Sequence, residues 1–143
     1  MNLKQKFALA TIGHSKHLDK LINDKNEYLR STVAETGNDK HRDKLLNDPS
    51  SRVRSSIAQH GSDEHRNHLI NDEDSWVKQK LAMYGNDTHR DKLLDDKDQD
   101  LFVRQTVAEH GNKDQATRLL KDKYGGIREK AMKRLRELGE KHE

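Results

Sequence analysis

A glycine recurs at a fixed interval of 24 residues along most of this chain, and the text that follows it recurs as well. Gly37, Gly61 and Gly85 open the similar segments GNDKHRDKLLND, GSDEHRNHLIND and GNDTHRDKLLDD. Gly13 lies 24 residues before the first of them, and Gly111 lies 26 residues after the last because two residues are inserted. A fixed period of this length is typical of a solenoid, in which each unit is stabilised by stacking on its neighbours.

The composition requires such stacking. Charged residues make up 37% of the 143 residues and hydrophobic residues only 30%, a balance that without the repeat would favour disorder. Each unit offers about six apolar side chains, which gain roughly 1.5–3 kcal/mol apiece when fully buried. Because ordering the backbone costs roughly 1–2 kcal/mol per residue, one unit cannot fold alone.

Each unit is predicted to contain two helices. In residues 37–61, Gly37 suits a left-handed position at a helix C-terminus, and Asn38 or Asp39 suits the N-cap of a short helix ending near residue 47. Asp48 then caps a second helix, with Pro49 in its first turn, that ends before Gly61. We therefore expect one all-α domain with an N-terminal capping helix in 1–13, repeats in 14–122 and a C-terminal capping helix in 123–143.

The unit D-P-x-x-x-V-R-x-x-[IV]-A-x-x-G, preceded by a short helix ending in Leu-Leu-x-Asp, resembles HEAT-like repeats, and its length resembles the leucine-rich-repeat variant. The resemblance implies a right-handed α-solenoid of about five two-helix repeats, with the second helices on a concave binding face. Similar chains occur in bacterial and phage genomes, which suggests an adaptor or an inhibitor. A founding member of the variant family carries an iron–sulphur cluster on cysteines; this chain has none, so we expect no cofactor.

A basic residue and an aspartate recur once per unit. Two interpretations apply to the basic series: a row of phosphate contacts, or side chains with buried stems whose heads pair with the turn aspartates. We prefer the structural interpretation, because the basic positions fall within the apolar sector of the second helix. The predicted structural Asp/Arg ladder consists of Asp24, Arg30, Asp48, Arg54, Asp72, Lys78, Arg104, Asp122 and Arg128.

Histidines also recur, at His17, His41, His65 and His89. Residues at one position of successive units are too far apart to bind one metal ion, so packing or hydrogen bonding at a helix terminus is the preferred interpretation. His68, three residues after His65, offers at most a second ligand, and we predict no metal site. The sequence also lacks a nucleophile–base arrangement and a phosphate-binding glycine loop, so we predict no enzyme activity.

Aromatic residues recur at the position just before the Leu/Val-Arg pair. Helix geometry places this position away from the apolar stripe, on the predicted concave face. Exposed Trp, Tyr and Arg side chains dominate the energetics of protein interfaces. The alternative is a structural role, in which these rings pack over a neighbouring unit. The predicted partner-binding residues are Tyr28, Arg52, Trp76, Lys80, Phe102, Gln59 and Gln105.

The function predicted from these patterns is a non-enzymatic, monomeric, cytoplasmic module that binds a protein partner. The net charge of +3 arises entirely in residues 121–143, where 8 basic residues face 5 acidic ones, while residues 1–120 carry 20 of each. This distribution is weak support for a basic stripe along the repeats. The alternative is a nucleic-acid-binding protein with a DNA-glycosylase-like fold, which would use Arg52, Lys80, Lys130, Lys133 and the basic C-terminal helix.

Overall fold

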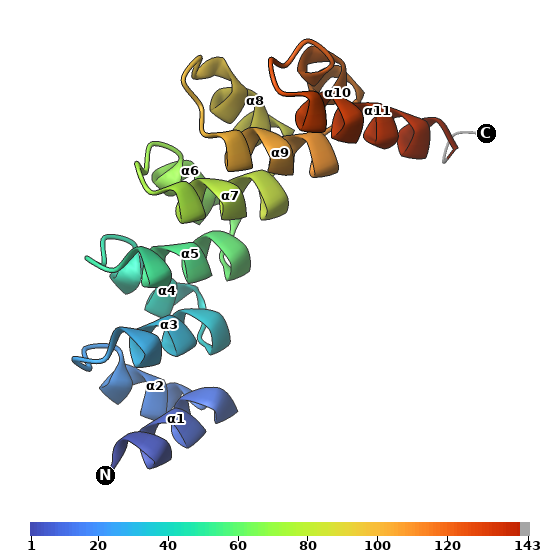
Figure 1. The fold of residues 1–143 in the computed structure, drawn as a ribbon. Coiled ribbons are helices and arrows are strands. Elements are labelled where there is room, and N and C mark those ends of the chain that lie inside the picture. Colours follow the sequence, from blue (N-terminus) through green and yellow to red (C-terminus); the bar gives the residue numbers. More distant parts are fainter. Residues whose placement is uncertain (141–143) are drawn as a thin grey trace. The chain divides into compact units, whose positions relative to one another are not determined.

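Over residues 1–140, the range that the computed structural model describes, the chain forms eleven α-helices and no strand (Figure 1). Longer and shorter helices alternate. The longer helices are α1 (Leu3–Ile12), α3 (Glu27–Thr36), α5 (Ser51–His60), α7 (Ser75–Tyr84), α9 (Leu101–His110) and α11 (Gly125–Glu140). The shorter helices are α2 (Ser15–Leu21), α4 (Asp39–Leu45), α6 (Asp63–Leu69), α8 (Asp87–Asp95) and α10 (Lys113–Leu119). Within residues 1–140 no helix combines the length and the apolar character needed to cross a lipid bilayer.

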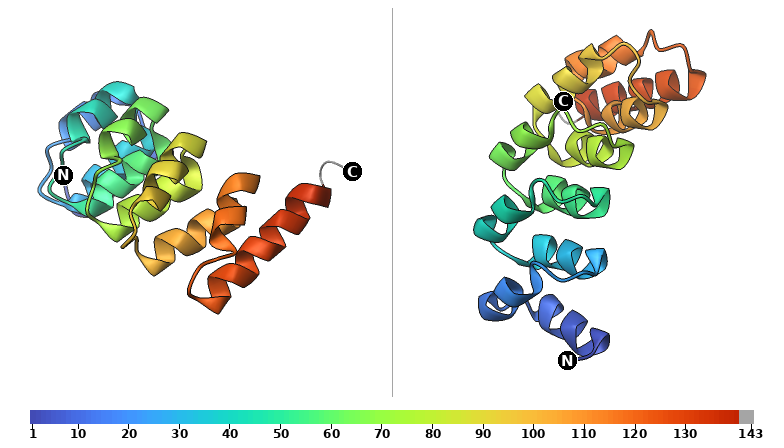
Figure 2. Two further views of the ribbon diagram at one scale, coloured as in Figure 1. Left: turned by 90° about the horizontal axis from the view of Figure 1, so that it is seen from above. Right: turned by 90° about the vertical axis from the view of Figure 1, so that its left-hand side faces the viewer.

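The chain divides into two compact units, Met1–Val77 and the part from Lys78 onward. In the first unit α1 packs on α3 and α3 packs on α5, so the long helices form one layer. The short helices α2, α4 and α6 each pack on a long helix and form a second layer (Figure 2). The core between the layers consists of fully buried side chains, among them Leu18, Leu29, Val33, Val53 and Ile57.

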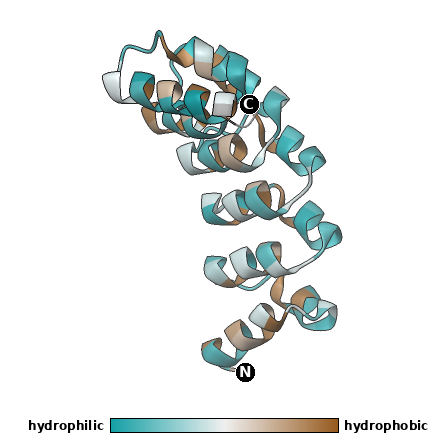
Figure 3. Cartoon of the chain, turned by 90° about the vertical axis from the view of Figure 1, so that its right-hand side faces the viewer, coloured by the Kyte–Doolittle hydropathy of each residue, from teal (hydrophilic) through white to brown (hydrophobic). Residues whose placement is uncertain are grey.

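The second unit repeats this arrangement. Helix α9 packs on α8, α10 and α11, and α10 packs on α11. Its core includes Val103, Val107, Leu119, Ile127 and Ala131. Hydrophobic residues occupy only part of each helix, with hydrophilic residues over the rest (Figure 3). The predicted C-terminal capping helix, 123–143, corresponds to α11, which begins at Gly125, two residues after the expected start; residues 141–143 of that prediction lie outside the described range.

The long helices begin later than the sequence suggested. Helix α5 starts at Ser51 with Ser50 as its N-cap, so the prediction that Asp48 caps this helix and that Pro49 lies in its first turn is wrong. In the equivalent place of α3 the N-cap is Asn26, whose side chain accepts the N–H groups of Tyr28 and Leu29. Asp48 is therefore free for another role, described below.

The repeated glycines are required for space and not for a left-handed backbone. The prediction of left-handed C-terminal glycines holds only for Gly13, with φ of 78°, while Gly37 and Gly61 are extended with φ of −78° and −79°. A Cβ atom on Gly61 would lie 2.7 Å from the carbonyl oxygen of Ile57 and 2.9 Å from Nδ1 of His65. Real Cβ contacts are longer than this, so the glycine lets the histidine of the next helix approach the backbone.

Core packing predicts the first stability test. Ile57 is fully buried in α5, whereas Ile12 is 73% exposed at the end of α1. Ile57→Ala leaves a cavity between layers and should lower the free energy of unfolding by about 2–5 kcal/mol. Ile12→Ala is the matched control and should change it by less than about 0.5 kcal/mol. Urea unfolding followed by circular dichroism measures both; equal effects of the two substitutions would contradict the assignment of the core.

A second test concerns the glycines. Gly61→Ala forces the His65 ring or the Ile57 carbonyl to move and should cost about 1–3 kcal/mol. Gly139→Ala is the control, because an added Cβ there meets nothing within 4 Å. Since alanine favours helix over glycine, Gly139→Ala should leave the thermal midpoint unchanged or slightly raised. A Gly61→Ala variant as stable as the parent chain would show that no close approach is needed.

Candidate protein-interaction surface

Basic residues of the long helices pair with aspartates 18 positions later, in the next 24-residue repeat of the chain. The N···O distances are 2.7 Å for Lys6–Asp24, 2.8 Å for Arg30–Asp48, 2.7 Å for Arg54–Asp72 and 2.8 Å for Arg104–Asp122. The Asp48 and Asp122 side chains are only 5% and 6% exposed. Each pair thus joins a long helix to the turn of the following unit.

Both members of each pair also hold backbone groups. The Asp48 carboxylate accepts the N–H of Ser50 at 2.9 Å, and Asp72 does the same for Asp74 at 2.9 Å. The Arg54 guanidinium donates a further bond to the carbonyl oxygen of Asp48 at 2.8 Å. The turn that begins at the aspartate is therefore fixed by the aspartate side chain, by the arginine of the same 24-residue repeat and by the arginine of the preceding repeat.

Two predicted members depart from this pattern. Lys78 and Arg128 have no described carboxylate partner within residues 1–140, and Arg128 donates only to the carbonyl oxygen of Asp122, at 2.6 Å. At the two-residue insertion, Asp96 keeps the aspartate turn by accepting the N–H of Asp98 at 2.9 Å. Lys6 belongs to the same series, although the sequence analysis did not include it.

The recurring histidines complete the N-termini of the short helices. His41 and His65 are 3% and 4% exposed. Their Nδ1 atoms accept the backbone N–H groups of Asn38 at 3.1 Å and Ser62 at 2.9 Å, which are the N-caps of α4 and α6. Because Nδ1 accepts, the neutral ring carries its proton on Nε2.

The Nε2 atoms of His41 and His65 point to the preceding 24-residue repeat. His41 contacts Asp19 and His65 contacts Asp43, each at 2.7 Å. Gln115 takes the same place in α10: its Oε1 accepts the N–H of Asn112 at 2.9 Å, and its Nε2 donates to Asp91 at 2.9 Å. A second inter-unit link therefore runs along the short helices. His17 does not share it, and its ring lies 5.6 Å from that of His14.

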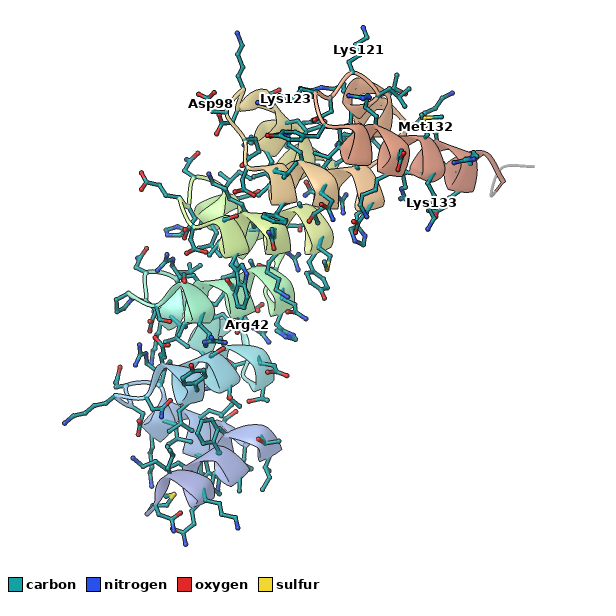
Figure 4. The ribbon with its side chains drawn as sticks, viewed as in Figure 1. Arg42, Asp98, Lys121, Lys123, Met132 and Lys133 are labelled. Atoms are coloured by element: carbon teal, nitrogen blue, oxygen red, sulfur yellow. The ribbon has the colours of Figure 1, made fainter. Side chains whose placement is uncertain are left out.

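Arginines next to these histidines satisfy the C-termini of the long helices. Arg42, Arg66 and Arg90 donate through Nε to the carbonyl oxygens of Ala34, Ala58 and Ala82 at 2.7–2.8 Å (Figure 4 labels Arg42). The last carbonyls of a helix have no partner within it, so this contact binds each short helix to the long helix before it. The dipeptide His-Arg at three of the repeats is the sequence signal for both links, and the sequence analysis did not use it. Among residues 1–140 no three His, Asp or Glu side chains lie together as metal ligands do.

Against this background, three of the predicted partner-binding residues form one surface. Tyr28 of α3, Arg52 of α5 and Trp76 in the first turn of α7 occupy the same position of successive long helices, and all three residues lie within Met1–Val77. The Arg52 guanidinium carbon lies 4.5 Å from the centre of the Tyr28 ring and 5.8 Å from that of Trp76. Tyr28 is 51% exposed and Trp76 is 55% exposed, as the helix geometry predicted. We call these residues the Tyr28–Arg52–Trp76 surface.

Arg52 differs from the other arginines of the first unit. Arg30, Arg42, Arg54 and Arg66 each donate hydrogen bonds to carboxylate or carbonyl oxygens. Among the described residues Arg52 donates none, and its nearest carboxylate oxygen, on Glu27, is 4.0 Å away. Its guanidinium is held by two rings and keeps its donors available.

The remaining predicted site residues lie elsewhere. Gln59 is two turns further along α5, where its carbonyl oxygen accepts from Arg66 at 3.2 Å. In the second unit, the Lys80 amine lies 5.6 Å from the Tyr84 ring centre, Phe102 is 58% exposed, and Gln105 donates to Glu109 at 3.4 Å.

A comparison of the chain with protein-family models, with curated proteins and with solved structures found no match.

The histidine link gives a prediction with a control supplied by the chain itself. His65→Gln should be tolerated, with a loss of less than about 1 kcal/mol, because Gln115 already makes the same bonds elsewhere. His65→Leu leaves the Ser62 N–H and the Asp43 carboxylate unpaired, and should cost about 1–3 kcal/mol. Thermal and urea unfolding of the two variants measure the difference. A leucine variant as stable as the glutamine variant would refute the capping role.

The Lys6–Asp24 pair predicts a dependence of stability on pH. The hydrogen bond from Lys6, and next that from the Asn26 N–H, hold the pKa of Asp24 below its ordinary value. A carboxyl group whose pKa is lowered by folding stabilises the fold above its unfolded pKa, about 3.9, and this contribution disappears as the pH falls through the folded pKa. Asp24→Asn, which removes the charge, should therefore destabilise the chain at pH 7 and much less at pH 3. Exposed Asp98→Asn is the control, and an Asp24→Asn effect that is the same at both pH values would contradict the pairing.

Proposed function

We propose that this chain is a non-enzymatic protein-interaction module that binds a protein partner on the Tyr28–Arg52–Trp76 surface. We further propose that its helices form a right-handed α-solenoid of HEAT-like repeats, with the long helices on the concave side. The observation that carries the function is the cation–π contact of a half-buried arginine with two exposed aromatic rings, the three side chains coming from three successive long helices. Trp, Tyr and Arg are the residue types that contribute most to binding at protein interfaces.

The other polar features of the repeats favour a structural role, which strengthens the contrast. The Asp/Arg pairs, the histidines and the His-Arg arginines bond to neighbouring helices and turns. In the Tyr28–Arg52–Trp76 surface, the contacts between repeats are the two cation–π contacts of Arg52 and its long ion pair with Glu27, at 4.0 Å, and Arg52 forms no described hydrogen bond. A rigid aromatic surface with unused donors loses little conformational entropy on binding.

A protein partner is favoured over nucleic acid because the surface combines two aromatic rings with a single cation. Within residues 1–140, Lys80 and Lys133 of the nucleic-acid alternative have no described carboxylate partner, but part of its basic charge is engaged by the chain itself. Of the basic residues in the nucleic-acid alternative, Lys130 binds Glu109 at 2.9 Å, and Arg134 of the same helix donates to the carbonyl oxygen of Gly111 at 2.8 Å. Binding to phosphates requires several cations to be free for the ligand, and such binding weakens steeply with salt.

We expect Trp76→Ala to weaken partner binding by about 2 kcal/mol or more, because a large ring leaves the centre of the interface. Its effect on unfolding should be smaller than that of Leu69→Ala, since Leu69 is 2% exposed and Trp76 is 55% exposed. The measurement is affinity capture from an extract of the organism that encodes the chain, with tagged parent and variant compared by quantitative mass spectrometry.

The control variant is Met132→Ala, which removes an apolar side chain that is 52% exposed on α11 of the second unit. It should retain every captured protein, in extracts with or without nuclease. A set of captured proteins that is the same for parent and Trp76→Ala, or that vanishes with nuclease or moderate salt, would contradict the proposal.

A further inference from the structure

We propose that the partner segment bound at the Tyr28–Arg52–Trp76 surface is an acidic peptide segment, and that one of its carboxylates accepts hydrogen bonds from Arg52. This inference rests on the proposed function and adds the chemistry of the partner. The Arg52 guanidinium forms no described hydrogen bond, and its ion pair with Glu27 is long, at 4.0 Å.

The two rings leave the guanidinium without a hydrogen-bond acceptor among the described residues. A guanidinium is planar and carries five N–H donors in its plane, and an aromatic ring is no match for their directed bonds to paired oxygens. The guanidinium carbon lies 4.5 Å from the centre of the Tyr28 ring and 5.8 Å from the centre of the Trp76 ring. Such rings hold the group in one orientation and reduce the entropy that a partner must remove on binding.

The chain itself does not use these donors. The Glu27 oxygen is 4.0 Å from Nε of Arg52, which is beyond hydrogen-bond distance. A carboxylate is the acceptor that matches the guanidinium best, because its two oxygens can accept two parallel N–H bonds.

The charge at this place selects a carboxylate over a phosphate. One guanidinium with a glutamate 4.0 Å away suits an incoming group with a single negative charge. A carboxylate meets the repulsion of Glu27 with one negative charge, whereas a phosphate dianion would meet about twice that repulsion with only one cation in direct contact. The rings on both sides of Arg52 suit aliphatic or aromatic residues next to the acidic one.

The test uses a displayed library of random 12-residue peptides, selected on the parent chain. We expect enrichment of peptides with Asp or Glu next to apolar residues. In one selected peptide, replacing the acidic residue by its amide should raise Kd for the parent about tenfold or more. The same replacement should change Kd less than about twofold for the Arg52→Gln variant, because the partner of the carboxylate is already absent. Arg52→Lys keeps the charge but not the two parallel donors, so we expect intermediate binding.

The outcomes separate this inference from the proposed function. Peptides that need Trp76 but have no acidic residue, or whose acid-to-amide change has the same effect on parent and Arg52→Gln, would overturn the carboxylate and leave the proposed function standing. Failure to select any peptide whose binding needs Trp76 would overturn both. Binding of a 12-nucleotide oligothymidine that is lost in Trp76→Ala and in Arg52→Gln would also overturn both. Circular dichroism of each variant checks that it is folded.

Discussion

The pairing of an arginine with the turn aspartate of the next unit is the interaction on which the rest of this structure depends. Only 30% of the residues are hydrophobic, so few apolar side chains are available to pack between successive helices. The Arg30–Asp48 and Arg54–Asp72 pairs join unit to unit where side chains are largely shielded from water. Since a charge left unpaired in such a place is costly, each pair specifies how neighbouring units are placed. The histidines of α4 and α6 add a parallel link on the short-helix layer, through Asp19 and Asp43.

These links explain why, in a chain with 37% charged residues, the Tyr28–Arg52–Trp76 surface differs from the other recurring positions described in the first unit. Most charged groups that recur with the repeat serve the backbone of a neighbouring helix or turn. Arg52 lies at a position where the adjacent units carry Tyr28 and Trp76, and it is the arginine of the first unit without a described hydrogen bond. The repeat thus supplies a recurring framework, and the variation at one of its positions supplies the surface that we propose binds a partner.

Much of the fold could be predicted from the period, because glycine spacing and apolar positions locate the helices to within a few residues. The exposure of Trp76 followed from helix geometry. The sequence could not show which aspartate Arg54 pairs with, because a 24-residue period makes the aspartate of its own unit and that of the next unit equivalent. The sequence also predicted the wrong role for Asp48, which resembles an N-cap but whose carboxylate forms hydrogen bonds in the turn that precedes the N-cap. The sequence pattern predicted a left-handed backbone for Gly37, whereas its backbone is extended and its missing Cβ leaves space for His41. The replacement of that histidine by Gln115 was a usable signal for a capping role, since both side chains can accept at one atom and donate at another.

The central claim is tested most directly by double-mutant cycles around Arg54. One cycle combines Arg54→Gln with Asp72→Asn, and a second combines Arg54→Gln with Asp48→Asn, with free energies of unfolding measured in urea. The account predicts a coupling of about 1–3 kcal/mol between Arg54 and Asp72, because their side chains are bonded. It predicts a coupling within about 0.5 kcal/mol of zero between Arg54 and Asp48, since the Asp48 side chain pairs with Arg30 and Arg54 contacts only its carbonyl group. Coupling to Asp48 in place of Asp72, or to neither, would contradict the claim that each arginine holds the next unit.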